Sequence, residues 1–560
     1  MDFPECILAN GITMALEKKR VEMTPVPDLH KAKRTGPDRM ERPIYLDLLP
    51  PCNEACPAGE NIQAWLRHVQ EGKFKQAWEE IMRNNPLPAV HGRVCYHPCE
   101  NNCNRQNVDA TVSIHAVERF LGDLAIEKGW SVSPDAPSSG KKVLVVGAGP
   151  SGLSVAYHLA RLGHHVTIHE AGPLAGGMMH FGIPKYRLPR QVLEAEINRI
   201  ERLGVRIVLN HKVEDVLQEK QDGGYDAVFL AVGAHLSRRT DIPARDAGKV
   251  LDALSFLRDV ESGEKPLLGR RVAIYGGGNT AIDAARTARR LGATEALIVY
   301  RRSREKAPAH AFEIDEAEEE GIKIHWLRTI KEIEGTTFTV EKMRLNSQGW
   351  PEPTGELEAL EADSLILALG QEADTTFLKH VPGLSFNKDG SLQVNDQMMT
   401  GYRGLFAGGD MVPYERTVTV AVGHGKKAAR CIDAYLRGTT YAAPPKHERV
   451  PFELLHLWYY SDAGQRKQSK ITLEQRQAGF AEVVAGLDER AALYEARRCL
   501  SCGNCFECDG CYAACPEEAV IKLGPGKRYQ YDYDRCTGCK ICFEQCPCSA
   551  IKMMPEPIHG

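Results

Sequence analysis

The sequence predicts a multidomain protein in which two α/β units with parallel sheets lie between two cysteine-rich segments. Three observations lead to this fold class. The chain has 560 residues, more than a single hydrophobic core usually organises. Two repeats of strand, glycine turn and helix begin near residues 141 and 270. Most of the 18 cysteines fall into two groups, one before Asn104 and one after Arg430, and none lies between these residues.

Composition and charge narrow the class of partners. Hydrophobic residues at 43% and charged residues at 26% are typical of soluble globular proteins. Seventy Lys and Arg against 74 Asp and Glu leave a net charge of -4, which disfavours nucleic acid and anionic lipid. The N-terminus lacks a signal-peptide pattern and no apolar run is long enough to span a membrane, so we expect a cytoplasmic protein. In such a chain, cysteines favour metal or redox chemistry over disulfides.

The C-terminal cysteines follow a doubled spacing, Cys-x-x-Cys-x-x-Cys-x-x-x-Cys-Pro. This spacing is typical of bacterial ferredoxins with two [4Fe-4S] clusters, in which the fourth cysteine of each run binds the other cluster. Zinc is the alternative, because Cys-x-x-Cys pairs also suit a tetrahedral ion, but the doubled run disfavours it. The sequence therefore predicts an α+β ferredoxin-like domain with the ligand sets Cys505, Cys508, Cys511 and Cys546, and Cys515, Cys536, Cys539 and Cys542.

The N-terminal cysteines are spaced less distinctively. Between them, apolar residues such as Ile62, Trp65 and Val69 recur at helical spacing. We expect an α-helical domain that holds metal through Cys52, Cys56, Cys95, Cys99 and Cys103.

The first α/β unit begins with the buried strand KVLVV, and its glycine turn leads into a helix and a second strand that ends on Glu170. Such glycines let the backbone approach a pyrophosphate at the helix N-terminus, while the carboxylate bonds ribose hydroxyls. Further along, GLFAGGDMV places Asp410 after a short strand and before a helix that faces the same ligand, FAD. The turn residues are Gly147, Gly149 and Gly152.

The second unit repeats this design with Gly276, Gly278 and Ala281. Its second strand ends on Tyr300 and is followed by Arg301 and Arg302 instead of a carboxylate. Arginines there suit a 2′-phosphate, which favours NADP(H) over NAD(H). The alternative is that both arginines belong to a solvated loop. The returning strands predict that this NAD(P) domain is inserted in the middle of the FAD domain.

The motifs GRVCYHPCENNC, VVGAGPSG, GGMMHFGIPKYRLP, YGGGNTAIDAA, VYRRSRE and LFAGGD resemble one family over about residues 45 to 445. It is the family of the small (beta) subunit of bacterial glutamate synthase, related to the N-terminal half of dihydropyrimidine dehydrogenase. The resemblance implies NADPH oxidation at FAD and iron-sulfur clusters in the helical domain. It also implies that FAD binds at Gly147, Gly149, Gly152, Glu170, Gly177 and Asp410, and the nicotinamide nucleotide at Gly276, Gly278, Asn279, Arg301 and Arg302.

Two departures from this family bear on the clusters. The family has an additional Cys-x-x-Cys pair before the position of Cys52, which this chain lacks, and no ferredoxin tail follows the usual glutamate synthase subunit. The segment EARRCLSC, before the ferredoxin run, resembles the missing pair. The alternative is that its thiols are spare. By resemblance we expect four clusters in all, the two further ones held by Cys52, Cys103, Cys499 and Cys502, and by Cys56, Cys95, Cys99 and Glu118.

These expectations give a provisional domain order. The ranges are 1–135 for the helical iron-sulfur domain, 141–255 and 372–445 for the two parts of the FAD domain, 256–371 for the NAD(P)H domain, 446–498 for a connecting segment and 499–560 for the ferredoxin-like domain.

The predicted function is that of a flavin and iron-sulfur NAD(P)H oxidoreductase. Hydride from the nicotinamide reaches FAD, and the clusters carry single electrons to a protein partner in a hetero-oligomer, such as ferredoxin, a 2-oxoacid oxidoreductase or a glutamate synthase large subunit. No acid-base residue is required. A disulfide reductase is disfavoured because no cysteine lies between Asn104 and Arg430. A true glutamate synthase small subunit and a non-catalytic scaffold with a structural flavin are the remaining alternatives.

Overall fold

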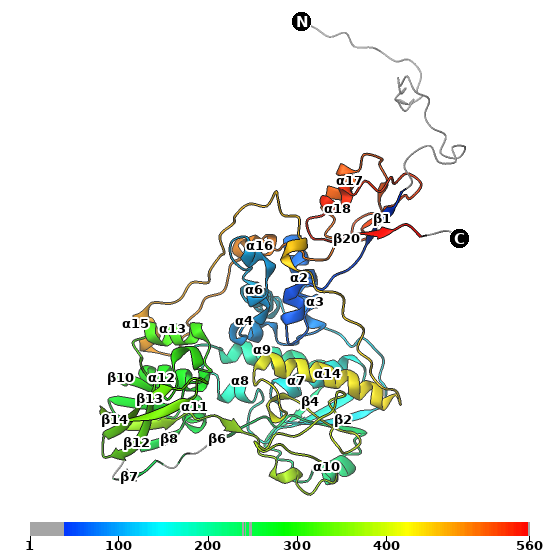
Figure 1. Cartoon of the computed structure of the whole chain (residues 1–560). Helices are drawn as coiled ribbons and strands as arrows, with labels where there is room; N and C mark the ends of the chain where they lie inside the picture. The colour runs from blue at the N-terminus through cyan, green and yellow to red at the C-terminus, as the bar shows by residue number, and fades with distance from the viewer. Residues whose placement is uncertain (1–38, 238–239, 241, 246–248, 558–560) are drawn as a thin grey trace, which may run out of the picture. The chain divides into compact units, whose positions relative to one another are not determined.

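The computed structural model describes residues 39–237, 240, 242–245 and 249–557 (Figure 1). Cys6 and the rest of residues 1–38 lie outside the described residues. The chain divides into two compact units. The larger comprises Asp47–Phe506 with Pro547–Ala550, and the smaller contains Glu507–Cys546 together with the flanking segments that end at Leu46 and begin at Ile551.

Short helices form the first part of the larger unit. Their apolar faces share a core that includes Trp65, Leu66 and Ile81, in agreement with the helical spacing of the sequence. Glycines bring two of these helices into backbone contact, because a Cβ on Gly122 would lie 2.3 Å from the amide nitrogen of Ala89. The helices are α1 (Pro51–Ala55), α2 (Ile62–Gln70), α3 (Phe74–Met82), α4 (Pro88–Val94), α5 (Pro98–Asn101) and α6 (Ile114–Glu127).

The first α/β domain is a five-stranded parallel sheet in the order β17-β5-β2-β3-β4. Its apolar core continues without a break into the helical part, since Trp78 and Val90 belong to the same cluster as Val145 and Phe406. The strands are β2 (Lys142–Val146), β3 (His165–His169), β4 (Arg206–Val208), β5 (Ala227–Leu230) and β17 (Leu405–Ala407), and the helices are α7 (Pro150–Arg161), α8 (Met178–Phe181), α9 (Arg190–Glu201), α10 (Val216–Asp222) and α14 (Val418–Leu436).

The second α/β domain is inserted between β5 and β17, which confirms the predicted insertion. Its parallel sheet has the order β11-β10-β9-β15-β8. The strand β8 pairs with β15, so it belongs to this sheet although the range 141–255 grouped it with the first. The strands are β8 (Lys249–Asp252), β9 (Arg271–Tyr275), β10 (Glu295–Tyr300), β11 (Lys323–Trp326) and β15 (Ser364–Leu367), and the helices are α11 (Ala253–Glu261), α12 (Asn279–Arg290) and α13 (Ala311–Glu319).

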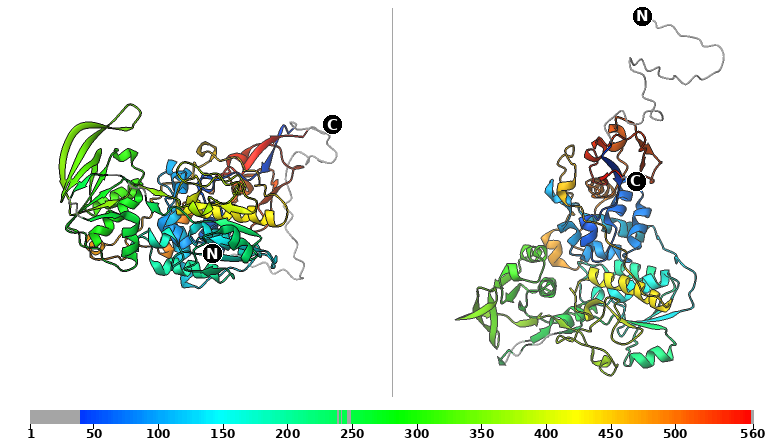
Figure 2. Two further views of the ribbon diagram at one scale, coloured as in Figure 1. Left: turned by 90° about the horizontal axis from the view of Figure 1, so that it is seen from below. Right: turned by 45° about the vertical axis from the view of Figure 1, so that its right-hand side comes forward.

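A second, mainly antiparallel sheet completes the inserted domain in the order β14-β13-β12-β7. Its long hairpin stands out at the edge of the domain in both views of Figure 2. A two-stranded ribbon of β6 and β16 joins the segments that run between the two α/β domains. The strands are β6 (Leu236–Ser237), β7 (Ala244–Arg245), β12 (Arg328–Glu334), β13 (Thr337–Leu345), β14 (Pro351–Glu361) and β16 (Gln371–Glu372).

The segment after α14 runs over the larger unit and carries α15 (Leu473–Ala478) and α16 (Glu489–Arg497). Near α15 it is tied to the inserted domain, because Lys470 Nζ lies 3.0 Å from a carboxylate oxygen of Glu316. It then returns to the helical part, where Gln70 donates a hydrogen bond of 2.7 Å to the carbonyl of Ala496 in α16. The connecting segment is therefore a strap with contacts at both ends.

The smaller unit is built from two short helices and two antiparallel strand pairs. The strand β1 pairs with β20, so residues 41–45 belong to this unit, whereas the range 1–135 placed them with the helical domain. Tyr45 stacks on Tyr531 with ring centroids 4.9 Å apart. The elements are β1 (Glu41–Tyr45), α17 (Gly510–Ala514), β18 (Val520–Lys522), β19 (Tyr529–Tyr531), α18 (Ile541–Glu544) and β20 (Ile551–Pro555).

The contact between α4 and α6 gives a prediction on stability. Gly122→Ala should destabilise the larger unit by about 1 to 3 kcal/mol, because the added methyl group would overlap backbone atoms that have no free space. Thermal unfolding followed by circular dichroism measures the effect. Gly464→Ala is the matched control, since nothing lies within 4 Å of a Cβ there. Equal melting temperatures for both variants would contradict this packing.

Candidate active site

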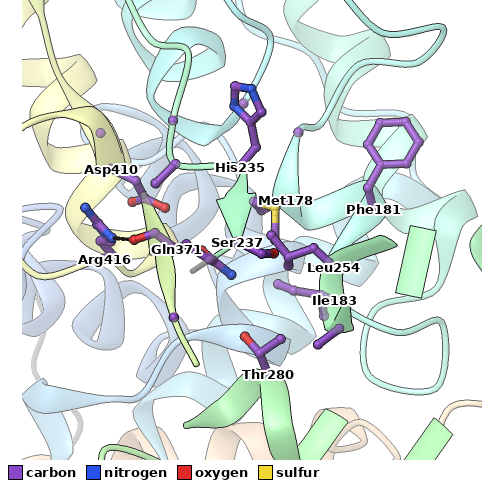
Figure 3. Close-up of a pocket in the computed structure, with 18 of the residues that line it drawn as sticks. Met178, Phe181, Ile183, His235, Ser237, Leu254, Thr280, Gln371, Asp410 and Arg416 are labelled. Carbon is purple, nitrogen blue, oxygen red and sulfur yellow. Dashed lines mark hydrogen bonds between the residues drawn. The ribbon is translucent and has the colours of Figure 1, made fainter. Parts of the chain in front are cut away.

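One cavity of about 1220 Å³ is lined by both glycine turns of the larger unit. Figure 3 shows side chains from several elements around it: Met178 and Phe181 come from α8, Ser237 and Gln371 from the ribbon, and Thr280 from α12. The cavity is larger than the space that a single small ligand fills in most proteins. It reaches from the N-terminus of α7 to the N-terminus of α12.

The first glycine turn shows why its residues carry no side chain. Gly147 has a φ of 103°, and a Cβ there would lie 2.5 Å from the carbonyl oxygen of Ala231. A Cβ on Gly152 would lie 2.0 Å from the carbonyl oxygen of Gly147. Gly149, in contrast, has nothing within 4 Å of its Cβ position and lines the cavity. The turn therefore presents bare backbone at the N-terminus of α7, as pyrophosphate binding requires.

Glu170 follows β3 and fixes the loops around this turn. Its carboxylate accepts hydrogen bonds of 2.8 Å from the amide of Ala148 and 2.7 Å from the amide of Gly172. It also lines the cavity. Gly177 lies close by, since a Cβ on it would be 2.9 Å from the Cα of Gly149.

Asp410 follows β17 in a short 3-10 helix (Gly409–Met411) and lines the cavity near Arg416 (Figure 3). Burial raises the pKa of Asp410 to about 6. The Thr417 hydroxyl caps α14 by accepting a hydrogen bond of 3.1 Å from the amide of Val420. Arg416 donates a hydrogen bond of 2.6 Å to the carbonyl of Gln371, which connects this end of the cavity to the ribbon.

The second glycine turn has the same construction. Gly276 has a φ of 152°, and a Cβ there would lie 2.2 Å from the carbonyl oxygen of Ala368. The side chain of Asn279, at the start of α12, does not point freely into the cavity. Its amide nitrogen donates a hydrogen bond of 2.6 Å to the hydroxyl of Tyr96, and its oxygen accepts one of 3.1 Å from the amide of His310. Asn279 thus joins the inserted domain to the helical part. Gly278 lines the cavity beside it.

The two arginines after β10 line the cavity with Tyr300. Arg301 is exposed, and Arg302 stacks on Trp350 at the tip of the β13–β14 hairpin, with 4.8 Å between the guanidinium carbon and the ring centroid. Within the described part of the chain, neither arginine has a carboxylate partner. Arg304, in contrast, is paired with Asp315 and Glu318. Arg301 and Arg302 therefore remain available to an anionic ligand.

The structure brings Cys52, Cys103, Cys499 and Cys502 together, although 396 positions of sequence separate the two pairs at Cys103 and Cys499. Burial, and after it the neighbouring thiolates, raises the pKa of Cys52 well above its usual value. Burial also raises the pKa of Cys499 and of Cys502 to about 12. We refer to these four residues as the first thiol set.

The segment that carries Cys499 is firmly attached to the helical part. Glu495 is fully buried and accepts a hydrogen bond of 2.9 Å from the amide of Ser113. Arg498 is 2% exposed, and its guanidinium donates to the carbonyls of Ala110 and Thr111 at 2.6 and 2.7 Å. These contacts hold the pair against the segment that precedes α6.

A second thiol set consists of Cys56, Cys95 and Cys99, with Glu118 beside it. Burial is the largest cause of the raised pKa of each thiol, and these cysteines are close enough to act on one another. Burial raises the pKa of Glu118 well above its usual value, and Cys95 contributes. The amide of Asn85 donates a hydrogen bond of 2.8 Å to Glu118.

Seven of the eight cysteines of the doubled C-terminal run lie in the smaller unit, and Cys505 lies in the larger one. A small cavity of the smaller unit is lined by Cys515, Cys536, Cys539 and Cys542. Cys508 and Cys546 are neighbours, and together with burial Cys546 raises the pKa of Cys508. The hydroxyl of Tyr45 lies 3.1 Å from the Sγ of Cys511.

The donor chemistry of these sets fits iron-sulfur clusters. The four thiol groups of the first set, which are buried together and have raised pKa values, ionise only if a cation replaces their protons. Thiolates are the ligands of such clusters, and the doubled spacing of the C-terminal cysteines favours clusters over a tetrahedral zinc ion.

Two α/β domains that open into one cavity, with thiol sets around them, define a flavin and NAD(P)H oxidoreductase that carries [4Fe-4S] clusters. The sequence matches the models of three families. These are pyridine nucleotide-disulphide oxidoreductase over residues 141–425, dihydropyrimidine dehydrogenase domain II with a 4Fe-4S cluster over residues 47–130, and the 4Fe-4S binding domain over residues 529–552. The described part of the chain contains no helix with both the length and the apolar composition that a membrane span needs.

Three curated relatives agree with these matches. The beta subunit of an NADP(+)-dependent formate dehydrogenase of Moorella thermoacetica is 38% identical over 505 residues, which cover 81% of this chain and 70% of the relative. The beta subunit of an NADPH-Fe(3+) oxidoreductase of Geobacter sulfurreducens is 34% identical over 510 residues, covering 81% and 75%. The subunit PreT of an NAD-dependent dihydropyrimidine dehydrogenase of Escherichia coli is 35% identical over 393 residues, covering 69% and 91%. The chain belongs to the pyridine nucleotide-disulphide oxidoreductase family, and within it to the relatives of the glutamate synthase small subunit.

The structure adds residues near these sites that sequence reasoning missed. Trp350 supports Arg302 from a hairpin 48 positions further along the chain, and Tyr96 holds Asn279 from another domain. Asn85, Thr419 and Lys426 lie near the second thiol set. No periodicity or spacing identifies such residues.

The contacts of Glu170 predict its role in FAD retention. Glu170→Ala should weaken FAD binding at least tenfold, because two charge-assisted bonds that order the glycine turn, each contributing about 1.5 to 3 kcal/mol, would be lost. The dissociation constant of FAD for the deflavinated protein measures this. Glu201→Ala, which removes an exposed carboxylate from α9, is the control. An unchanged FAD affinity of the Glu170 variant would contradict the assignment.

Proposed function

We propose that the chain is the electron-transfer subunit of a larger oxidoreductase, in which electrons pass between NADPH, FAD, four [4Fe-4S] clusters and a protein partner. The observation that carries this proposal is the single cavity lined by both glycine turns, together with the thiol sets of the same unit. Such an arrangement suits a protein that accepts two electrons together from NADPH and passes them on one at a time.

The cofactors supply complementary chemistry, since a flavin accepts a hydride and releases electrons singly, and a cluster takes one electron at a time. The residues of the chain would bind and orient these cofactors. Gly147, Gly149, Gly152, Glu170, Gly177 and Asp410 would hold FAD. Gly276, Gly278 and Asn279 would hold the nucleotide, with Arg301 and Arg302 on its 2′-phosphate.

Four ligand sets follow from the thiol groups. The first and second thiol sets would each hold one cluster, with the Glu118 carboxylate as the fourth ligand of the second. The doubled C-terminal run would hold two more clusters. Those two sets are Cys505, Cys508, Cys511 and Cys546, and Cys515, Cys536, Cys539 and Cys542.

The partner is a second protein, because the relatives from Moorella, Geobacter and Escherichia are each named as one subunit of a larger enzyme. We propose that this partner handles the substrate of the whole complex. Ferredoxin, a 2-oxoacid oxidoreductase and a glutamate synthase large subunit are candidate partners. Cluster assembly on free thiolates is favoured in a reducing compartment, and we therefore infer a cytoplasmic location.

Anaerobic titration with NADPH tests the proposed function. Stoichiometric NADPH should bleach the flavin absorbance, and paramagnetic signals of reduced clusters should follow. If NADPH does not reduce the flavin at a rate that could support turnover, the chain is a scaffold with a structural flavin. Affinity purification of the native protein, followed by identification of what copurifies, would name the partner.

The free arginines predict nucleotide preference. Arg301→Ala with Arg302→Ala should raise the KM for NADPH tenfold or more and leave the KM for NADH nearly unchanged, because each bond to a 2′-phosphate contributes about 1.5 to 3 kcal/mol. Steady-state kinetics with both nucleotides and an artificial electron acceptor measure the effect. Arg304→Ala is the matched control, since this guanidinium is already paired with Glu318 at 2.8 Å. Equal increases in the KM for NADPH and for NADH would contradict a contact between these arginines and the 2′-phosphate.

The first thiol set predicts a cluster that joins distant parts of the chain. Cys499→Ser with Cys502→Ser should lose about four irons, as expected for a [4Fe-4S] cluster deprived of half its thiolates. Iron analysis together with electron paramagnetic resonance measures the loss. Cys431→Ser is the control, because Cys431 is buried but belongs to neither thiol set. Unchanged iron and an unchanged spectrum in the double variant would show that Cys499 and Cys502 are spare thiols.

A further inference from the structure

The helix α14 forms a wall that the cavity and the second thiol set share. Its first turn faces the cavity, which Val418 and Ala421 line. On the same turn, the hydroxyl of the buried Thr419 bonds the thiol of Cys95 and lowers the pKa of that thiol against the larger effect of burial. One turn later a Cβ on Gly423 would lie 2.1 Å from the carbonyl oxygen of Pro57, the residue after Cys56. Only backbone thus separates this helix from the Cys56 loop.

Lys426 lies on the next turn of α14 and is 9% exposed. Its ammonium group donates hydrogen bonds of 3.1 Å to the carbonyl of Gly59 and 3.1 Å to the side-chain oxygen of Asn84, and a third to the carbonyl of Ala58. Among the described residues, no carboxylate forms an ion pair with Lys426. The cation is therefore held by neutral oxygens, two on the loop that follows Cys56 and one on Asn84 after α3.

The glycines of the same region keep α14 close to both neighbours. A Cβ on Gly425 would lie 2.5 Å from the carbonyl oxygen of Ser151 in α7, the helix of the first glycine turn. Gly59 has a φ of +65°, and a Cβ there would lie 2.7 Å from the Nζ of Lys426. A buried cation at this position acts on the second thiol set through little intervening protein.

We propose that Thr419 and Lys426 are positioning residues that raise the reduction potential of the cluster held by the second thiol set. This inference rests on the proposed function, in which that cluster takes single electrons from the flavin. Each electron adds one negative charge to the cluster, and a nearby buried cation stabilises the more negative state. A hydrogen bond to a ligating thiolate acts in the same direction. NADPH supplies the electrons, two with each hydride.

The test is a redox titration of the full-length holoprotein with dithionite, followed by electron paramagnetic resonance. In Lys426→Gln, which keeps a donor but removes the charge, we expect one cluster signal to become about tenfold harder to reduce, a shift of 59 mV for one electron. Thr419→Val should move the same signal in the same direction. Lys426→Arg should restore the potential. Lys427→Gln is the matched control, because Lys427 is the exposed neighbour with the same charge.

Potentials in Lys426→Gln and Thr419→Val that equal those of the unaltered protein, with full iron content, would overturn the proposal. So would an equal shift in Lys427→Gln, which would indicate a general effect of surface charge. If Lys426→Gln loses iron, Thr419→Val decides by its potential alone. Because dithionite delivers the electrons, the result does not depend on whether NADPH reduces the flavin, and a failure of the proposed function remains distinguishable.

Discussion

Burial of thiol groups in sets is the constraint on which the arrangement of the chain depends. A thiolate that leaves water loses its hydration, so each buried cysteine of the two sets has a raised pKa and stays protonated unless a cation takes the place of the proton. Metal binding is then coupled to folding, because the ligands come together only in the folded chain. For the first thiol set this coupling reaches from α1 to the end of α16.

A continuous apolar core joins the helical part, which carries the second thiol set, to the first α/β domain. Trp78 and Val90 of the helical part pack in one cluster with strands of the first α/β domain, so the two parts cannot separate without exposing that core. The buried Glu196 of α9 reinforces the contact by accepting hydrogen bonds of 3.1 and 3.2 Å from the amides of Ala89 and Val90. The cavity and the second thiol set are therefore neighbours, since α14 borders both and Val94 and Tyr96, on either side of Cys95, line the cavity.

Local patterns predicted local features well. Steric limits act directly on residues adjacent in sequence, as in the glycine turns and the ferredoxin spacing. The insertion of one α/β domain in the other follows from the order of such local patterns along the chain. The proximity of Cys499 to Cys52 could be expected only because EARRCLSC resembles the pair that the family carries before the position of Cys52. Lys426 and Trp350 could not be found this way, because their partners are backbone carbonyls and a guanidinium supplied by the tertiary fold. The strand β1 was missed because its partner, β20, begins about 500 residues later.

Charged contacts specify the orientation of the inserted domain. Arg187, which follows α8 in the first α/β domain, is paired at 2.8 Å with Asp283 of α12 and also with Glu313 of α13, and all three side chains are largely buried. Buried ion pairs contribute little net stability because desolvation offsets their attraction, but any other orientation would leave these charges unpaired at a cost of several kcal/mol. These ion pairs therefore favour the orientation of the inserted domain in which both glycine turns open into one cavity. The cavity is thus formed before any ligand binds.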